Sequence, residues 1–126
     1  MYIYKITVLP INQVYIGLDT GDSKKLKRWK QHLNDCQKKQ DTKLQKALYH
    51  YGVNQSKIEV IHDNVQSIFD LLNLEIMYIQ QYDSYKNGLN STPGGDGWGH
   101  KDLLLLSEQE MELLKCHLLI IIRICY

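Results

Sequence analysis

The sequence predicts a small α/β domain of the α+β kind, with a three-stranded, largely antiparallel sheet flanked by helices. Three observations lead to this fold class. The chain has 126 residues, which suits one domain, and its composition of 44% hydrophobic and 23% charged residues is that of an ordinary globular protein. Its predicted elements follow the order strand, strand, helix, helix, strand, helix. We expect residues 1–98 to form the domain and residues 99–126 a helical, apolar extension.

The first two elements are strands joined by a short loop. Residues 2–8 alternate β-forming side chains, and a second strand begins at Val14. The few residues between them, Asn12 included, favour a hairpin. This hairpin would bring Tyr4 and Tyr15 together across the strands, although such tyrosines are more often ordinary half-buried strand residues.

Two amphipathic helices follow the hairpin. The first is predicted over residues 24–36, with Asp22 or Ser23 as its N-cap. The second begins after Asp41 or Thr42, and it ends at a glycine, which is the residue type that favours a helix C-terminus.

The remaining elements are a strand, a long helix and a glycine-rich loop. Residues 57–62 alternate as a third strand, and residues 65–82 form a helix that is apolar on most sides. The loop over 87–99 contains five glycines and a proline. In the apolar stretch 103–126, a capping-box pattern predicts a helix capped at Ser107.

Several protein classes are disfavoured by the composition. No apolar run reaches the roughly 18 residues that a membrane-spanning helix needs, and the N-terminus does not resemble a secretory signal. Three cysteines are too few and too scattered for a disulfide framework, and the five histidines lack zinc-site spacing. We therefore expect an intracellular protein that has no membrane partner.

Charge is distributed unevenly, although the formal net charge is only +1. Residues 24–46 contain nine basic and two acidic residues, whereas residues 59–112 contain ten acidic and two basic ones. Such a basic block is a candidate surface for the phosphates of a nucleic acid, although a lysine run is more often a solvated helix face.

Glu75 is the most informative single residue, because its predicted helix is so apolar. Its neighbours three and four positions away are Leu71, Leu72, Tyr78 and Ile79. A carboxylate on that face is costly unless it lies at the mouth of a cleft or beside a cation or metal ion. The alternative is a narrow exposed edge of the helix.

Three further polar residues are candidates for a site. Arg28 and His32 lie four residues apart, so both project from the same side of the first helix, where a guanidinium and an imidazole suit a phosphate. Chance produces many such pairs on surface helices. Asn90 lies in the glycine-rich loop, where its amide can bond backbone groups or orient a phenol or a phosphate.

Taken together, these residues resemble the GIY-YIG nuclease family over residues 1–98. Tyr2-Ile3-Tyr4 stands where the family has its GIY motif, and Tyr15-Ile16-Gly17 supplies YIG. The later motif positions follow in order and with similar spacing: Arg28, His32, Glu75, Asn90 and the glycines at 94, 95 and 97.

The resemblance implies a metal-dependent endonuclease that hydrolyses phosphodiester bonds of double-stranded DNA. It implies that Glu75 holds Mg²⁺ or Mn²⁺, that Arg28 stabilises charge on the phosphate, and that Tyr4 and Tyr15 lie beside the attacking water. His32 would assist and Asn90 would support the site. From the basic block we expect the DNA contacts to come from Lys24, Lys25, Lys27, Lys30, Lys38 and Lys39.

A phage or mobile-element nuclease of the homing type is the favoured role. Ile, Asn, Tyr and Lys contribute 42 residues, which indicates the A/T-rich genome that such elements often have. Two features depart from the family: Tyr2 replaces the glycine of GIY, and the 28 residues after Trp98 are too few for a DNA-recognition domain. A non-catalytic DNA-binding module and a repair or restriction nuclease are the alternatives, and the oligomeric state is left open.

Overall fold

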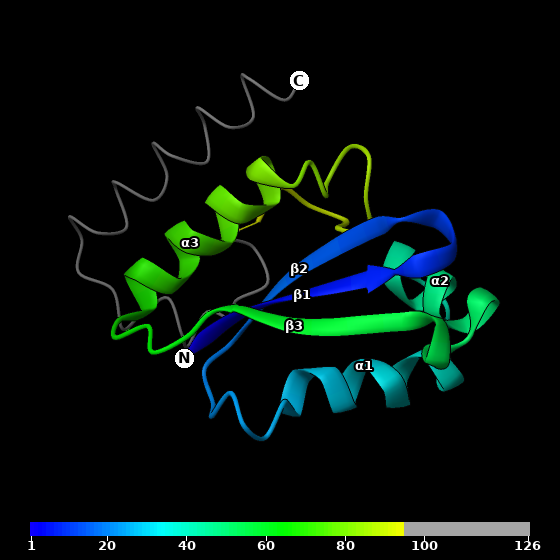
Figure 1. Ribbon diagram of the computed structural model, residues 1–126, viewed down its shortest axis with the longest axis horizontal. Coiled ribbons are helices and arrows are strands. Elements are labelled where there is room, and N and C mark those ends of the chain that lie inside the picture. Colours follow the sequence, from blue (N-terminus) through cyan, green and yellow to red (C-terminus); the bar gives the residue numbers. More distant parts are fainter. Residues whose placement is uncertain (95–126) are drawn as a thin grey trace.

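The computed structural model describes residues 1–94. The predicted helix after Ser107, the glycines at 95 and 97, and the extension over 99–126 lie outside these residues. Figure 1 shows the order of the elements. They are β1 (Tyr2–Val8), the 3₁₀ turn η1 (Leu9–Ile11), β2 (Gln13–Asp19), α1 (Lys27–Lys38), α2 (Lys43–Tyr51), the 3₁₀ turn η2 (Val53–Gln55), β3 (Ser56–His62) and α3 (Ile68–Gln81).

The three strands form one antiparallel sheet in the order β2-β1-β3, which confirms the predicted fold class. β1 is the central strand, and its alternating side chains are buried on both faces of the sheet. The register of the β1–β2 hairpin places Tyr4 opposite Gly17 and Ile6 opposite Tyr15. Asn12 closes the hairpin in the left-handed conformation, as its residue type allows.

Helices cover both faces of the sheet, so the domain has three layers (Figure 1). On one face, Tyr4 and Ile6 of β1 pack into a core with residues of α1 and α2, among them Leu48. On the other face, Ile3 packs with Leu71 and other residues of α3. β2 is an edge strand, and at its edge the two helical layers approach each other.

The first helix begins three residues later than predicted, and neither predicted N-cap caps it. Asp22 instead accepts a hydrogen bond from the Lys24 amide in a turn, with an N–O distance of 2.9 Å. The N-cap is Leu26, which has φ +47° and no capping side chain. Asp19 at the end of β2 accepts the amide hydrogen of Arg28 in its place, with an N–O distance of 3.1 Å. Tertiary structure supplies this cap, so local sequence could not predict it.

The two later helices agree better with the sequence. Thr42 caps α2 with a full capping box, and Gly52 ends it with φ +89°. α3 begins at Ile68, three residues after the predicted start, because Ser67 accepts a hydrogen bond from the amide of Asp70. Val65 is buried and its amide donates to the Met1 carbonyl, so an apolar side chain outside the helix resembled part of the helical pattern.

Within residues 1–94, no helix has the length and apolar character that crossing a bilayer requires.

Candidate active site

A pocket of about 330 Å³ opens beside β2, where α1, α3 and the loop over 88–94 come together. Five of the six predicted catalytic residues line it: Tyr15, Arg28, His32, Glu75 and Asn90. Tyr4 lies directly behind them, in contact with His32. The structure therefore gathers all six residues in one place, although they are spread over 87 positions of the sequence.

The two tyrosines lie side by side because Gly17 leaves room for them. Their ring centroids are 6.1 Å apart. A Cβ atom at Gly17 would clash with Cζ and Oη of Tyr4, and it would lie 2.8 Å from Cε1 of Tyr15. Glycine at this position of the YIG motif thus has a steric explanation, because both phenol rings pack directly against its Cα.

His32 is buried against both phenols. Its Nε2 lies 2.8 Å from the Tyr4 hydroxyl oxygen, and its ring centroid lies 5.2 Å from that of Tyr15. Burial, with the nearby Arg28 charge as a smaller cause, lowers the pKa of His32 to about 4. The imidazole is therefore neutral at physiological pH. Its Nε2 can accept a hydrogen bond from the Tyr4 hydroxyl when Nδ1 carries the ring N–H.

Both phenols stay protonated at neutral pH. Burial raises the pKa of Tyr4 well above its usual value, and the adjacent Tyr15 adds to this effect, whereas Arg28 opposes it. Burial also raises the pKa of Tyr15, with Glu75 acting in the same direction and Arg28 again opposing. Tyr15 thus experiences both the Arg28 and the Glu75 charge, and a further cation beside the phenols would favour loss of a proton.

Arg28 projects from the first turn of α1 into the pocket. Its side chain is half-buried, and one guanidinium nitrogen donates to Oε1 of Gln31 at 2.6 Å. The same group acts on the pKa of Tyr4, Tyr15 and His32. This fixed positive charge is the donor that a phosphate in the pocket would meet.

Glu75 lies on α3 across the pocket, half-buried between buried leucines and Ile79. The chain passes close to it at Gly94, which has φ +102°. A Cβ atom there would lie 3.3 Å from Oε1 of Glu75. Of the two positions left open by the sequence, the structure has the carboxylate at a cleft rather than at a narrow exposed edge.

The donor set of this pocket fits a hard divalent cation held by few protein ligands. Within residues 1–94, no three His, Cys, Asp or Glu residues cluster in a way that could enclose a metal ion. Glu75 and Asp35 are the carboxylates of this open, polar pocket. Such a sparse set matches Mg²⁺, which keeps most of its waters and binds through one or two carboxylates and substrate phosphates. Glu75 is the residue that would hold it.

Asn90 fastens the loop to the edge of β2. Its amide oxygen accepts from the Ile16 backbone N–H and its amide nitrogen donates to the Ile16 carbonyl, both at 2.8 Å. The amide of Leu89 adds a bond to the Val14 carbonyl at 2.9 Å. Both hydrogen-bonding ends of the Asn90 amide are thus used by backbone, so this residue shapes the wall of the pocket.

Sequence reasoning missed several polar residues of the pocket. Asp35, Thr42 and Gln45 also line it. Asp35 follows His32 by one helical turn, so helical spacing could have indicated it. Thr42 was predicted only as a possible cap of α2 and Gln45 was not singled out, and nothing in the sequence showed that this helix end faces the site.

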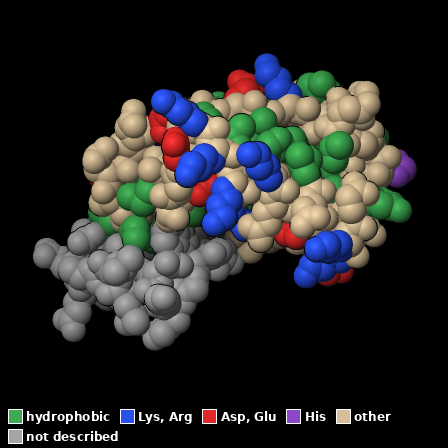
Figure 2. Space-filling model, turned by 90° about the horizontal axis from the view of Figure 1, so that it is seen from below, with side chains coloured by type: hydrophobic (Ala, Val, Ile, Leu, Met, Phe, Trp, Pro, Cys, Tyr) green, Lys and Arg blue, Asp and Glu red, His purple; other side chains and the backbone are tan. Residues whose placement is uncertain are grey.

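The six predicted DNA-binding lysines are all exposed. Figure 2 views the molecule from the side of α1 and shows Lys and Arg side chains gathered on this face, with some acidic ones among them. None of the six takes part in the ion pairs found within residues 1–94, both of which involve Glu59.

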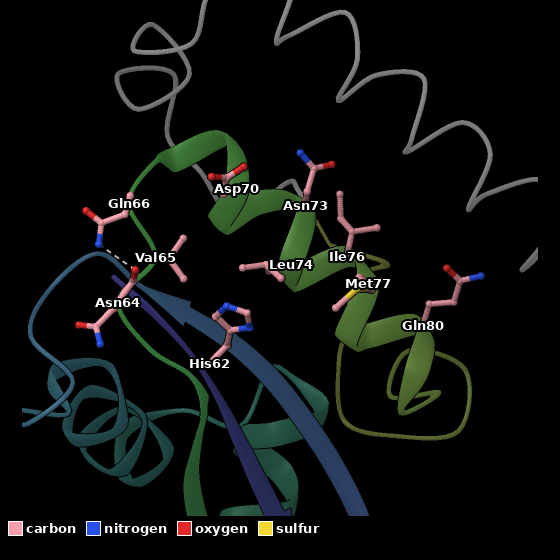
Figure 3. A pocket seen from close by; sticks show the side chains of 10 residues that line it. All are labelled: His62, Asn64, Val65, Gln66, Asp70, Asn73, Leu74, Ile76, Met77 and Gln80. Atoms are coloured by element: carbon pink, nitrogen blue, oxygen red, sulfur yellow. Dashed lines mark hydrogen bonds between the residues drawn. The ribbon is translucent and has the colours of Figure 1, made fainter.

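A larger cavity of about 720 Å³ lies elsewhere, along α3 and the end of β3 (Figure 3). Its walls within residues 1–94 combine apolar side chains such as Leu74 and Met77 with amides such as Asn73. It contains none of the predicted site residues, so its size does not make it the site of chemistry.

Two solved structures are similar to this chain. The E75A mutant of the catalytic domain of intron endonuclease I-TevI is 26% identical, with a TM-score of 0.65, and the match covers 75% of this chain and 96% of that one. The catalytic domain of homing endonuclease I-TevI is 27% identical, with a TM-score of 0.63, covering 72% and 97%. No protein-family model and no curated protein matches the sequence. The two structures confirm the resemblance to the GIY-YIG nucleases and the α+β fold.

The close approach at Gly17 predicts a large effect of one methyl group. Gly17→Ala should destabilise the domain by about 1–3 kcal/mol, because overpacking forces the two phenol rings apart. Chemical denaturation measures this loss. Gly21→Ala is the control and should cost less, since its Cβ meets Oδ1 of Asp19 at 3.2 Å, a contact that a shift of a few tenths of an ångström relieves. Equal stability of the Gly17 variant and the wild type would contradict the steric argument.

The buried His32 predicts a pH dependence of stability. Its pKa is lowered on folding, so the unfolded chain binds a proton that the folded one does not, and stability falls as the pH drops below about 6.5. Between pH 7 and pH 5 we expect a loss of about 1–2 kcal/mol from this residue. His32→Gln should reduce the dependence of the free energy of unfolding on pH over this range. His50→Gln, at an exposed position, should leave that dependence as in the wild type. An unchanged slope in the His32 variant would show that this histidine titrates freely.

Proposed function

We propose that this chain, which has the GIY-YIG nuclease fold, is an endonuclease of the mobile-element type that hydrolyses phosphodiester bonds of double-stranded DNA with a divalent cation. One observation carries the proposal. Tyr4, Tyr15, Arg28, His32 and Glu75 meet at one pocket whose polar groups suit a phosphate and a metal ion. The similarity to a homing endonuclease catalytic domain supports the same reaction.

Glu75 is the proposed ligand of Mg²⁺ or Mn²⁺. When bound there, the cation would polarise a phosphate oxygen and neutralise charge on the leaving oxygen. The carboxylate is carried by the apolar helix α3, whose packing against the sheet fixes the position of its backbone.

Arg28 is the proposed stabiliser of the transition state. Arg28 and Glu75 line the same pocket from α1 and α3, so a phosphate bound there meets a fixed positive charge. Because hydrolysis increases the charge on the phosphate oxygens, this contact strengthens during the reaction. The half-buried position of Arg28 makes it stronger than a contact in bulk water.

The two tyrosines are the proposed route for the proton of the attacking water, and His32 orients Tyr4. Both phenols are protonated at neutral pH, so a phenol that takes this proton must give up its own, to the leaving oxygen or to solvent in the pocket. The Tyr4 hydroxyl lies 2.8 Å from Nε2 of His32, which is neutral and accepts its hydrogen bond, and a pKa of about 4 makes His32 too weak a base to keep the proton. Tyr15 lies next to Tyr4 at the pocket surface and is the phenol nearer to a bound phosphate.

The lysine face of α1 is the proposed DNA-binding surface. Lys27 and Lys30 project from the outer side of the helix that carries Arg28, and Lys24 and Lys25 lie in the turn before it. A duplex held there would lie beside the pocket. Binding through lysine–phosphate contacts would be strong at low salt and largely independent of sequence.

The catalytic proposal predicts loss of cleavage without loss of DNA binding. Purified protein with Mg²⁺ should nick supercoiled plasmid, and EDTA should stop the reaction. Glu75→Gln should lower the rate at least about 100-fold, and Arg28→Ala should lower turnover more than affinity. Glu59→Gln, a matched change on β3, should behave as the wild type.

Two outcomes of the plasmid assay would reject this function. One is the absence of nicking by the wild type, which together with salt-dependent DNA retention would indicate the alternative, a binding module of the same fold. The other is equal nicking by Glu75→Gln. Mapped cut sites would separate a homing role from repair or restriction.

The DNA surface predicts a specific salt dependence. Replacing Lys27 and Lys30 by alanine should each lower the slope of log K against log[salt] by about 1, because one phosphate contact is lost. Lys57→Ala is the control, since this lysine lies on β3 and pairs with Glu59. Unchanged slopes for the α1 variants would place the DNA on another face. Gel retention of a short duplex at several salt concentrations measures the effect.

A further inference from the structure

We propose that Tyr2 and Asp19 form a buried clamp that positions Arg28 for the reaction. This inference rests on the proposed function, and it concerns two residues that take no direct part in it. They are paired across the β1–β2 hairpin, at the end of the sheet where α1 begins. Tyr2 is fully buried and Asp19 is 6% exposed.

Three hydrogen bonds satisfy the Asp19 carboxylate. Its Oδ2 accepts from the Tyr2 hydroxyl at 2.8 Å and from the Arg28 backbone N–H at 3.1 Å. Its Oδ1 accepts from the Gly21 N–H at 2.8 Å. A buried carboxylate without such partners would be strongly unfavourable, so these contacts define where Asp19 sits and what it holds.

The clamp replaces a helix cap that α1 lacks. The residue before α1 is Leu26, a left-handed, apolar residue whose side chain accepts no hydrogen bond. The first amides of a helix need acceptors, and a negative charge near them is favourable. Asp19 supplies both to the turn that contains Arg28, and so it ties this turn to the sheet.

The position of this turn sets the position of the guanidinium. Arg28 must reach the pocket from α1, while Tyr4 and Tyr15 reach it from the sheet. The only polar link of the Arg28 backbone to the sheet within residues 1–94 is its bond to Asp19. Misplacing a catalytic group by about 1 Å can lower a rate about 100-fold, so a loosened turn should affect catalysis.

The clamp also accounts for the departure from the GIY motif. Tyr2 stands where the family has glycine, and its ring fills the core beside Tyr4, with a centroid separation of 6.0 Å. Its hydroxyl is then buried and needs a partner, which Asp19 provides from the neighbouring strand. The unusual tyrosine and the buried aspartate are thus one unit.

A first experiment tests the clamp without using activity. Amide hydrogen exchange, measured by NMR, should show a protected Arg28 amide in the wild type and at least about tenfold faster exchange in Tyr2→Phe and Asp19→Asn. Tyr78→Phe is the matched control, because it removes a hydroxyl whose hydrogen-bond partner among residues 1–94 is the exposed His62. Unchanged protection of the Arg28 amide in Tyr2→Phe would overturn the clamp, and Tyr2→Phe decides this even if Asp19→Asn fails to fold.

A second experiment tests the effect on catalysis. At saturating protein, Tyr2→Phe should lower the single-turnover nicking rate about tenfold, with DNA affinity changed less than about twofold. In an Arg28→Lys background the same change should have little further effect, because the clamp acts through Arg28. If the wild type nicks DNA but Tyr2→Phe lowers the rate equally in the wild-type and Arg28→Lys backgrounds, the positioning role is overturned and the proposed function stands. Absence of nicking by the wild type would instead reject the proposed function.

Discussion

The site depends on the pairing of β1 with β2, in a register that places Gly17 opposite Tyr4. Because side chains alternate along a strand, a slip of one residue would turn Tyr15 to the other face and separate the two phenols. The register also places Tyr2 opposite Asp19, so one hairpin carries both the tyrosine pair and the anchor of α1. A short hairpin turn closed by Asn12 holds this register locally.

The chemistry of the pocket follows from burial. His32 and the two phenols lie in a region that disfavours charge, so all three are neutral at physiological pH. Arg28 and Glu75, side chains of opposite charge type, line the same pocket and come from opposite layers of the domain. In such surroundings each charge acts over a longer range than in water, which allows a few side chains to control a reaction.

The edge of the sheet at β2 contributes to the pocket. An edge strand exposes unpaired backbone groups, and here the loop over 88–94 covers those of β2 through the amides of Leu89 and Asn90. The same loop brings Gly94 against Glu75 and closes the wall of the pocket. The loop thus both pairs with the edge of β2 and forms a wall of the pocket that holds the predicted site residues. The larger cavity along α3 contains none of these residues.

The sequence by itself determined the elements and much of their order. Local chemistry acts within a few residues, so alternation predicted the strands, and Thr42 and Gly52 predicted the bounds of α2. It also identified Glu75 as a carboxylate that needed an explanation, and the motif spacing selected its partners. Their catalytic roles stay predictions. Only the tertiary structure decided that α1 begins at Lys27, because Asp19 at the end of β2 accepts the hydrogen bond that a local cap would accept. The same holds for the pocket, because its walls are contacts between segments far apart in the chain, and local pattern contains no information about such contacts.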